Sequence, residues 1–182
     1  MPYAFAILSD GEVSEWLMVP LSKSGRRKPR GFESRPLRGS PSQTFVLIPI
    51  ATILLDAVLR RRMQLHPRWL PVLVAGYMLY RVAGAHRERR GAGPPGFATM
   101  PDRLVTDGPY AVSRNPMYLG HLVFLGGLIG LTRSPFALLF GVRQLFRFRR
   151  RVAFDEDRLE RAFGDEYRAY VARVPRWFGP YT

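Results

Sequence analysis

The chain has 182 residues, which is enough for one domain and too few for two of ordinary size. It contains no cysteine, and this excludes disulfides, zinc–thiolate sites and thiol catalysis. With 28 basic and 14 acidic residues the formal net charge is +14, a value that suits a nucleic-acid-binding protein or a protein lying on anionic lipid.

Residues 1–43 differ from the rest of the chain because they show no sustained helical or strand period. They lack the basic start and long apolar core of a signal peptide. The stretch GEVSEWLMVPLSKSG, followed by RGFESRPLR, resembles the translation of a transfer-RNA gene, whose T-arm encodes the Gly-Phe-Glu-Ser of residues 31–34. We therefore expect residues 1–43 to be a disordered extension from a start codon set too far upstream, the alternative being a genuine basic leader. Residues 44–182 are then the functional domain.

Four apolar segments follow, at residues 45–59, 69–85, 117–131 and 136–146, and arginine tracts adjoin them at residues 60–62, 87–90 and 147–151. This flanking pattern is typical of membrane helices. A run of about 15 residues spans only about 22 Å as a helix, against a hydrocarbon core of about 30 Å. Each segment would therefore need flanking Trp, Tyr and snorkelling Arg side chains to cross. The sequence predicts an all-α, multi-pass membrane helical bundle with about four membrane helices. A soluble bundle is the alternative, which the lack of a polar face on these runs disfavours.

The connection between the third and fourth segments, residues 132–135, is too short to be anything but a tight turn, so these segments should form a hairpin. An even number of crossings would place the loop at 86–116 and the C-terminal tail on the same side. Both are rich in arginine, which predicts a cytoplasmic location for that side. The triplet at residues 60–62 would then lie outside, and this argues for a partial first crossing.

After Arg151 the pattern becomes that of a C-terminal amphipathic helix. Its apolar residues recur every three or four positions: Leu159, Phe163, Tyr167, Tyr170 or Val171, and Val174. Asp157 and Arg161 should pair across one helical turn. Gly164 lies within the pattern and predicts either a kink or a close approach to the backbone, and Pro175 should end the helix.

Two turns precede the third apolar segment. Residues 107–110, Asp-Gly-Pro-Tyr, are a strong turn signal, and residues 113–116, Ser-Arg-Asn-Pro, can open a helix with Ser113 or Asn115 as its cap. Tyr118 and His121 share a helical face, three residues apart. A histidine in an apolar segment is most often a core residue, although an ionisable group at membrane depth is also a functional candidate.

The acidic pair Asp155 and Glu156 has two interpretations. Acidic residues favour the first turn of a helix, where they interact with its dipole. A carboxylate at this position could instead accept hydrogen bonds from the hydroxyls or ammonium of a ligand. The spacing of the residues leaves both interpretations open.

Together, GPYAVSRNPMYLG and DEDRLERAFGDEYRAYVARVP resemble the isoprenylcysteine carboxyl methyltransferases and the related phospholipid methyltransferases. The shared pattern is Gly-x-Tyr, Arg-His-Pro-x-Tyr, a Glu-Glu pair and Phe-Gly-x-x-Tyr-x-x-Tyr, and the likeness covers roughly residues 103–178. It implies an integral membrane enzyme that transfers a methyl group from S-adenosylmethionine. Asn115 stands where the family has His, and Asp155 stands where it has the first Glu. Because Asn cannot titrate, Asn115 would position groups rather than transfer protons.

By this resemblance the cofactor-binding residues are Gly108, Tyr110, Arg114, Asn115, Tyr118, Asp155 and Glu156, and we add His121 because it shares the helical face of Tyr118. Arg151 and Glu156 would lie beside the methyl-transfer centre as the catalytic pair, with no metal. The implied partners are membrane lipids and a lipid-like or apolar small acceptor, such as a prenylated cysteine, reached from the bilayer. A carboxylate oxygen, an amine nitrogen and a thiol sulfur are all compatible acceptor atoms.

Two other functions compete with this one. A non-catalytic small basic membrane protein would use the arginine tracts to bind anionic lipid. A nucleic-acid-binding module would explain the net charge, but the sequence lacks the aromatic-rich sheet or recognition helix that such a module needs. We therefore expect no nucleic-acid partner, and no pattern indicates an oligomeric state.

Overall fold

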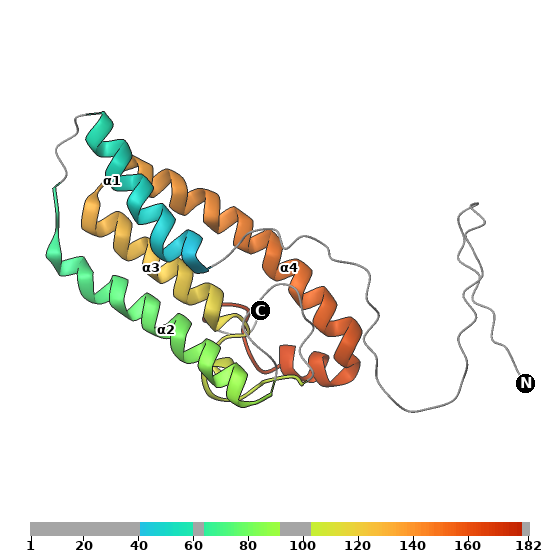
Figure 1. Ribbon diagram of the computed structural model, residues 1–182. Coiled ribbons are helices and arrows are strands. Elements are labelled where there is room, and N and C mark those ends of the chain that lie inside the picture. The colour runs from blue at the N-terminus through green and yellow to red at the C-terminus, as the bar shows by residue number, and fades with distance from the viewer. Residues whose placement is uncertain (1–40, 60–63, 92–102, 180–182) are drawn as a thin grey trace, which may run out of the picture. The chain divides into compact units, whose positions relative to one another are not determined.

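The structure, a computed structural model, describes residues 41–59, 64–91 and 103–179, all within the compact unit Ser34–Thr182. Four α-helices make up most of these ranges: α1 (Ile48–Val58), α2 (Leu70–Arg89), α3 (Pro116–Thr132) and α4 (Pro135–Val171) (Figure 1). A π-helical turn, Gln43–Leu47, leads into α1, and 3-10 turns occupy Pro67–Trp69 and Gly108–Ala111. The predicted all-α fold with four helices is confirmed.

Helices α2 and α3 approach each other closely because glycines line their contact. A Cβ atom placed on Gly76 would lie 2.3 Å from the backbone nitrogen of Phe124, and one on Gly120 would lie 2.7 Å from that of Tyr80. No side chain fits in that space, so the two backbones pack directly against each other. This contact fixes the start of α3, where the turn of residues 107–116 ends, against α2.

Helices α1 and α4 also pack together, on the other side of α3. The apolar cluster there comprises Ile48, Leu125, Leu128 and Ala137, with Leu73, Ile129 and Phe140 packed around it. A buried polar contact accompanies it, since Gln144 Nε2 donates to Thr44 Oγ1 over 3.3 Å. Arg147 also reaches back to the π-helical turn and donates to Gln43 Oε1 over 2.6 Å.

The predicted hairpin between the third and fourth segments is confirmed. Arg133 adopts the left-handed conformation with φ 47°, and its backbone N–H bonds to the carbonyl of Ile129 over 2.8 Å. Ser134 caps α4 by accepting a hydrogen bond from Phe136 N over 3.2 Å, and Pro135 occupies the first turn. Helices α3 and α4 therefore follow each other with only a tight turn between them.

The C-terminal amphipathic segment is not a separate helix that begins after Arg151, because α4 continues through that position. The helix breaks instead at Gly164, where φ is 50° and ψ is −119°. The predicted kink is thus confirmed. A Cβ atom there would meet nothing within 4 Å, so no close contact explains this glycine. The helix ends at Val171, before Pro175.

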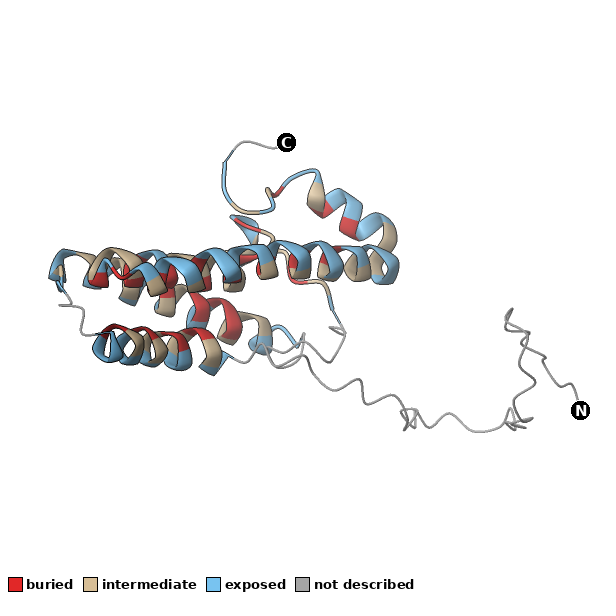
Figure 2. Cartoon of the chain, turned by 90° about the horizontal axis from the view of Figure 1, so that it is seen from above, coloured by how far each residue is buried: buried red, intermediate tan, exposed pale blue. Residues whose placement is uncertain are grey.

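Beyond the kink, the predicted apolar stripe forms a small second core. Tyr167, Tyr170 and Val174 are buried together, and Leu104, Leu159, Phe163 and Val171 pack against them. Figure 2 shows this last part of the chain turning back beside the long straight part of α4. The turn brings the residues after α4 towards the loop that precedes α3.

Many residues of the helices are exposed (Figure 2), and a large share of them are apolar. They include Ile50, Ile53, Leu54 and Val58 of α1, Leu70, Val74, Met78 and Val82 of α2, and Leu138, Leu139, Val142 and Phe146 of α4. In the described ranges, no helix combines enough length with enough apolar character to cross a bilayer. The extension predicted at residues 1–43 lies outside the described residues except for 41–43, and so does the arginine triplet at 60–62.

Candidate functional site

The loop before α3 is attached to the end of α2 through Asp107. Its carboxylate accepts a hydrogen bond from His86 Nε2 over 2.9 Å and pairs with Arg90. The hydrogen bond from His86 and the charge of Arg90 hold the pKa of Asp107 below its ordinary value of 3.8. Gly108 follows with φ 59°, and a Cβ atom there would lie 2.6 Å from the His86 ring. The predicted turn glycine is therefore required for this attachment.

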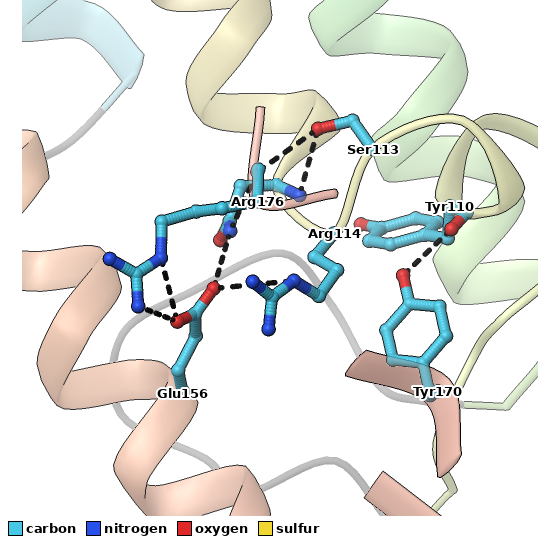
Figure 3. Close-up of polar contacts among 7 residues, drawn as sticks. Tyr110, Ser113, Arg114, Glu156, Tyr170 and Arg176 are labelled. Atoms are coloured by element: carbon cyan, nitrogen blue, oxygen red, sulfur yellow. Dashed lines mark hydrogen bonds and ion pairs between the residues drawn. The ribbon is translucent and has the colours of Figure 1, made fainter. Parts of the chain in front are cut away.

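Glu156 of α4 is the centre of a buried polar cluster (Figure 3). Asn115 Nδ2 donates to Glu156 Oε1 over 3.1 Å, and Arg114 Nε lies 3.8 Å from the same oxygen. Arg176 donates twice to Oε2, from Nε over 2.9 Å and from Nη2 over 2.6 Å. Glu156 is only 8% exposed as a residue, so these donors take the place of water around its carboxylate.

Asp155, the neighbour of Glu156, binds a different set of partners. The Tyr118 hydroxyl donates to Asp155 Oδ2 over 2.7 Å. Arg151, one turn earlier on α4, places Nε 3.2 Å from Oδ2 and Nη2 3.1 Å from Oδ1. The structure thus pairs Arg151 with Asp155, although the resemblance groups it with Glu156. Adjacent helix positions differ by about 100° in direction, which lets each carboxylate face its own partners.

The segment after α4 closes over this cluster through backbone contacts. The N–H of Arg114 donates to the carbonyl of Pro175 over 2.9 Å. The carbonyl of Arg176 accepts from Ser113 Oγ over 3.3 Å and from Asn115 Nδ2 over 3.2 Å. Asn115 does occupy the position before α3, but its side chain makes no capping bond, because its amide is used for Glu156 and Arg176.

Two of the four tyrosines in the quoted motifs, Tyr110 and Tyr170, lie side by side. The Tyr170 hydroxyl donates to the backbone carbonyl of Tyr110 over 2.7 Å (Figure 3). Burial raises the pKa of Tyr110 to about 12 and that of Tyr170 beyond its usual range. Both phenols therefore stay protonated at any physiological pH. The hydrogen bond from Tyr170 holds the loop at Tyr110 against the end of α4.

His121 lies apart from the two carboxylates. Its ring stacks on Phe45 with centroids 4.6 Å apart and contacts Tyr80 and Phe148 at 4.8 and 5.2 Å. Only 7% of its surface is exposed, and its Nδ1 atom has no hydrogen-bond partner among the residues that the structure describes. Phe148 also contacts Tyr118, with centroids 5.3 Å apart, and is the link between His121 and the cluster. The structure thus places His121 in an aromatic core.

Sequence reasoning missed Arg176, His86 and Ser113 as members of the site. Arg176 lies beyond the quoted motif, and His86 follows the apolar segment 69–85 directly, at the start of the predicted loop, where no motif singles it out. Ser113 appeared only as a helix cap. In the described ranges, no group of three or more His, Asp or Glu side chains is placed to bind a metal ion. The cluster is instead a set of charged and aromatic groups suited to a polar organic cation or zwitterion.

Comparison with known proteins places these residues in a family. Residues 92–166 match the family described as phospholipid methyltransferase. Protein-S-isoprenylcysteine O-methyltransferase B of Arabidopsis thaliana is 35% identical over 74 residues, which cover 40% of this chain and 38% of that protein. Protein-S-isoprenylcysteine O-methyltransferase of Schizosaccharomyces pombe is 38% identical over 73 residues, covering 40% of this chain and 31% of that protein.

The chain therefore matches less than half of the length of these curated relatives. The family match includes the loop from Asp107 to Asn115, all of α3, and α4 as far as residue 166, with both carboxylates. Arg176 lies outside it. Through this segment, the chain is similar to the phospholipid and isoprenylcysteine methyltransferases.

Proposed function

We propose that the protein is an integral membrane methyltransferase that uses S-adenosylmethionine to methylate a lipid-like or apolar small acceptor, in the manner of the isoprenylcysteine carboxyl methyltransferases. The observation that carries the proposal is the contact of Asn115 with Glu156 over 3.1 Å. It joins the loop before α3 to the far half of α4, and these are the two motif segments. Had they lain at opposite ends of the hairpin, no shared cofactor site would exist.

The residues of the cluster fit the chemical groups of the cofactor. Glu156 would accept hydrogen bonds from the ammonium or ribose hydroxyls, and Arg114 would pair with the carboxylate. The rings of Tyr110 and Tyr118 suit the adenine and the sulfonium. Glu156 is now bound by Arg176, whose side chain is 51% exposed. A ligand ammonium could therefore replace this guanidinium while the carboxylate keeps a positive partner throughout.

When bound, S-adenosylmethionine supplies an electrophilic methyl group on a positively charged sulfur. Transfer to an acceptor atom would form one bond to this carbon as the C–S bond breaks and its electron pair returns to sulfur. The positive charge on sulfur would be lost in this step, so excluding water and aligning the reactants would be the main contributions of the protein. Arg151, held in place by Asp155, would orient the acceptor, and Glu156 would orient the methyl donor.

The acceptor should reach the site from a membrane. Apolar side chains cover the outer faces of α1, α2 and the first half of α4, as a lipid environment requires. We propose that the α3–α4 hairpin lies in the bilayer up to about residue 146 and that the arginines from Arg147 onward lie at the interface. The cofactor site would then face the cytoplasm, on the same side as the arginine-rich loop before α3.

Binding of the cofactor tests the proposal directly. Purified full-length chain in detergent should bind S-adenosylmethionine, as measured by calorimetry and by photo-crosslinking of the labelled methyl group. Glu156→Gln, which keeps the shape but not the charge, should weaken binding at least tenfold, since hydrogen bonds to charged groups contribute about 1.5–3 kcal/mol. Glu160→Gln is the matched control, because Glu160 is exposed on the same helix and pairs only with Arg168 among the described residues.

Two results would overturn the proposal. A folded wild-type chain that binds no S-adenosylmethionine would favour a non-catalytic membrane protein. Unchanged affinity in the Glu156→Gln variant would refute the site.

If S-adenosylmethionine binds, transfer of labelled methyl groups into total lipid and small-thiol extracts, followed by product identification, would name the acceptor. Retention in the membrane pellet after high-salt and alkaline washes would support integral insertion.

A further inference from the structure

A cavity of about 710 Å³ opens along α4, and its lining includes Arg151, the partner of Asp155 in the cluster described above. We call it the arginine groove, and its lining includes Arg143, Arg147, Arg150, Arg151, Phe146 and Phe154. The arginines follow the spacing i, i+4, i+7 and i+8, which places them on one face of the helix. The groove is thus a row of guanidinium groups with phenyl rings between them.

The positive charge of this row is paired only in part with acidic residues within the described ranges. Arg151 pairs with Asp155, and Arg147 donates to the neutral amide of Gln43. Arg143 and Arg150 have no acidic partner in those parts of the chain, and Arg143 lies one helical turn from Arg147. Like charges at this spacing repel each other and weaken a helix. An anion in the groove would relieve this repulsion.

The aromatic residues of the groove show what kind of anion it suits. Phe146 is 59% exposed and Phe154 is 52% exposed, and the Arg151 guanidinium lies 5.3 Å from the centre of the Phe154 ring. Water-exposed phenyl rings beside arginines favour a ligand with an apolar part attached to its charge. The cavity is also much larger than a free phosphate needs and lies within the range of small-molecule sites.

We propose that the arginine groove binds the headgroup of an anionic phospholipid. Its phosphate would accept hydrogen bonds from the guanidinium groups, which bind phosphate in a two-pronged geometry. The first part of its acyl chain would lie against Phe146 and Phe154. Such a lipid would fix the depth of α4 at the membrane surface beside the cofactor site. The lipid would be a resident partner and not the acceptor; because Arg151 lines the groove and also belongs to the proposed acceptor site, the variants that test the inference leave Arg151 unchanged.

The test compares lipids and two double variants in the absence of S-adenosylmethionine. The full-length chain in neutral detergent is titrated with phosphatidylglycerol and with phosphatidylcholine, and bound lipid is counted by native mass spectrometry. Wild type should prefer phosphatidylglycerol. Arg143→Gln/Arg150→Gln should lower this affinity about thirtyfold, given roughly 1 kcal/mol for each arginine near an anionic surface. Arg143→Lys/Arg150→Lys, which retains the charge, should keep most of it.

Arg149→Gln/Arg161→Gln is the matched control. It removes the same charge from the same helix, at two exposed positions outside the groove. This control should bind phosphatidylglycerol as wild type does. An equal loss in both double variants would show that binding follows net charge alone and would overturn the proposal. So would an absence of preference between the two lipids, or displacement of phosphatidylglycerol by millimolar inorganic phosphate. Circular dichroism of each variant checks that it is folded.

Discussion

Asn115 and Glu156 are 41 positions apart in the sequence, yet the amide of the first donates to the carboxylate of the second over 3.1 Å. The same amide nitrogen also donates to the carbonyl of Arg176. A single side chain thus joins the loop before α3, the middle of α4 and the segment after α4.

Asn115→Ala should destabilise the protein by about 1–3 kcal/mol, because it leaves the buried carboxylate of Glu156 and the carbonyl of Arg176 each short of one donor. In detergent this corresponds to a fall in melting temperature of about 2–4 °C per kcal/mol.

Asn115→Asp has the same shape but places a second carboxylate beside Glu156. Since the two cannot both ionise at low cost, the folded pair should hold a proton more tightly than the unfolded chain does. The Asp variant should therefore be least stable at high pH and recover as the pH falls. An Asp variant whose stability is independent of pH would contradict the observed contact.

Tyr118→Phe should also destabilise the protein, by about 1–3 kcal/mol, since it removes a short hydrogen bond to the carboxylate of Asp155. Tyr77→Phe is the control, because the Tyr77 hydroxyl accepts only an exposed hydrogen bond, from Arg81 over 3.2 Å. Its loss should change stability by no more than about 0.5 kcal/mol. Thermal unfolding of both variants measures the difference. Equal effects would mean that Tyr118 contributes through its ring alone.

Gly120→Ala should separate α2 from α3. The new methyl group would lie 2.7 Å from Tyr80 N and 2.8 Å from the carbonyl oxygen of Gly76, and both of these are backbone atoms. Overpacking of this kind costs about 1–3 kcal/mol or more. Gly126→Ala on the same helix meets nothing within 4 Å and should stabilise the helix by up to about 1 kcal/mol. Melting temperatures should move in opposite directions, and a shift of the same sign in both variants would refute the close contact.

Gly164→Ala should straighten α4. The combination of φ 50° and ψ −119° is strained for any residue with a Cβ atom, at a cost of about 1–3 kcal/mol, so the variant should relax towards helical angles. The cluster of Tyr167, Tyr170 and Val174 would then move away from its contacts. Because the chain has no cysteine, spin labels at Arg149→Cys and Arg173→Cys are unique. The distance between them should lengthen in the alanine variant. An unchanged distance together with unchanged stability would show that the kink does not depend on glycine.

The attachment of the loop through Asp107 should depend on pH in the acid range. A carboxyl group whose pKa is lowered on folding stabilises the native state above its unfolded pKa, and this contribution is lost as the pH falls through the folded value. For Asp107 the contribution is therefore complete at neutral pH and disappears below about pH 3.8. His86→Gln should raise the Asp107 pKa towards its ordinary value, as measured by carboxyl carbon NMR. Arg90→Gln should raise it less, because the hydrogen bond from His86 is the larger cause.

Much of this architecture is predictable from the sequence. The apolar runs and the short connection at residues 132–135 predict the helices and the hairpin. The spacing from Leu159 to Val174 predicts the apolar stripe that forms the second small core, and Gly164 predicts a kink or a close approach, of which the structure has the kink. Each of these features depends on local periodicity and turn chemistry, which neighbouring residues determine.

The rest depends on contacts between distant residues. The change of composition at Arg151 does not end the helix, because no glycine or proline occurs between Gly141 and Gly164. The motif contains both carboxylates but does not show which donors each one faces, since this follows from the rotation of α4 against α3. Arg176 belongs to no motif, and only the return of the chain after Val171 brings it to Glu156. Whether the assigned residues bind a cofactor stays a prediction.

Because α4 is unbroken from Ser134 through Glu156, the number of residues in it determines both the distance and the rotation between the hairpin turn and the two acidic side chains. Inserting one residue between them would rotate everything beyond by about 100° and shift it by about 1.5 Å along the axis. Asp155 would then lie near the direction now taken by Glu156, and Glu156 would point elsewhere. Natural variation in this stretch should therefore change the identity of its residues freely while preserving their number.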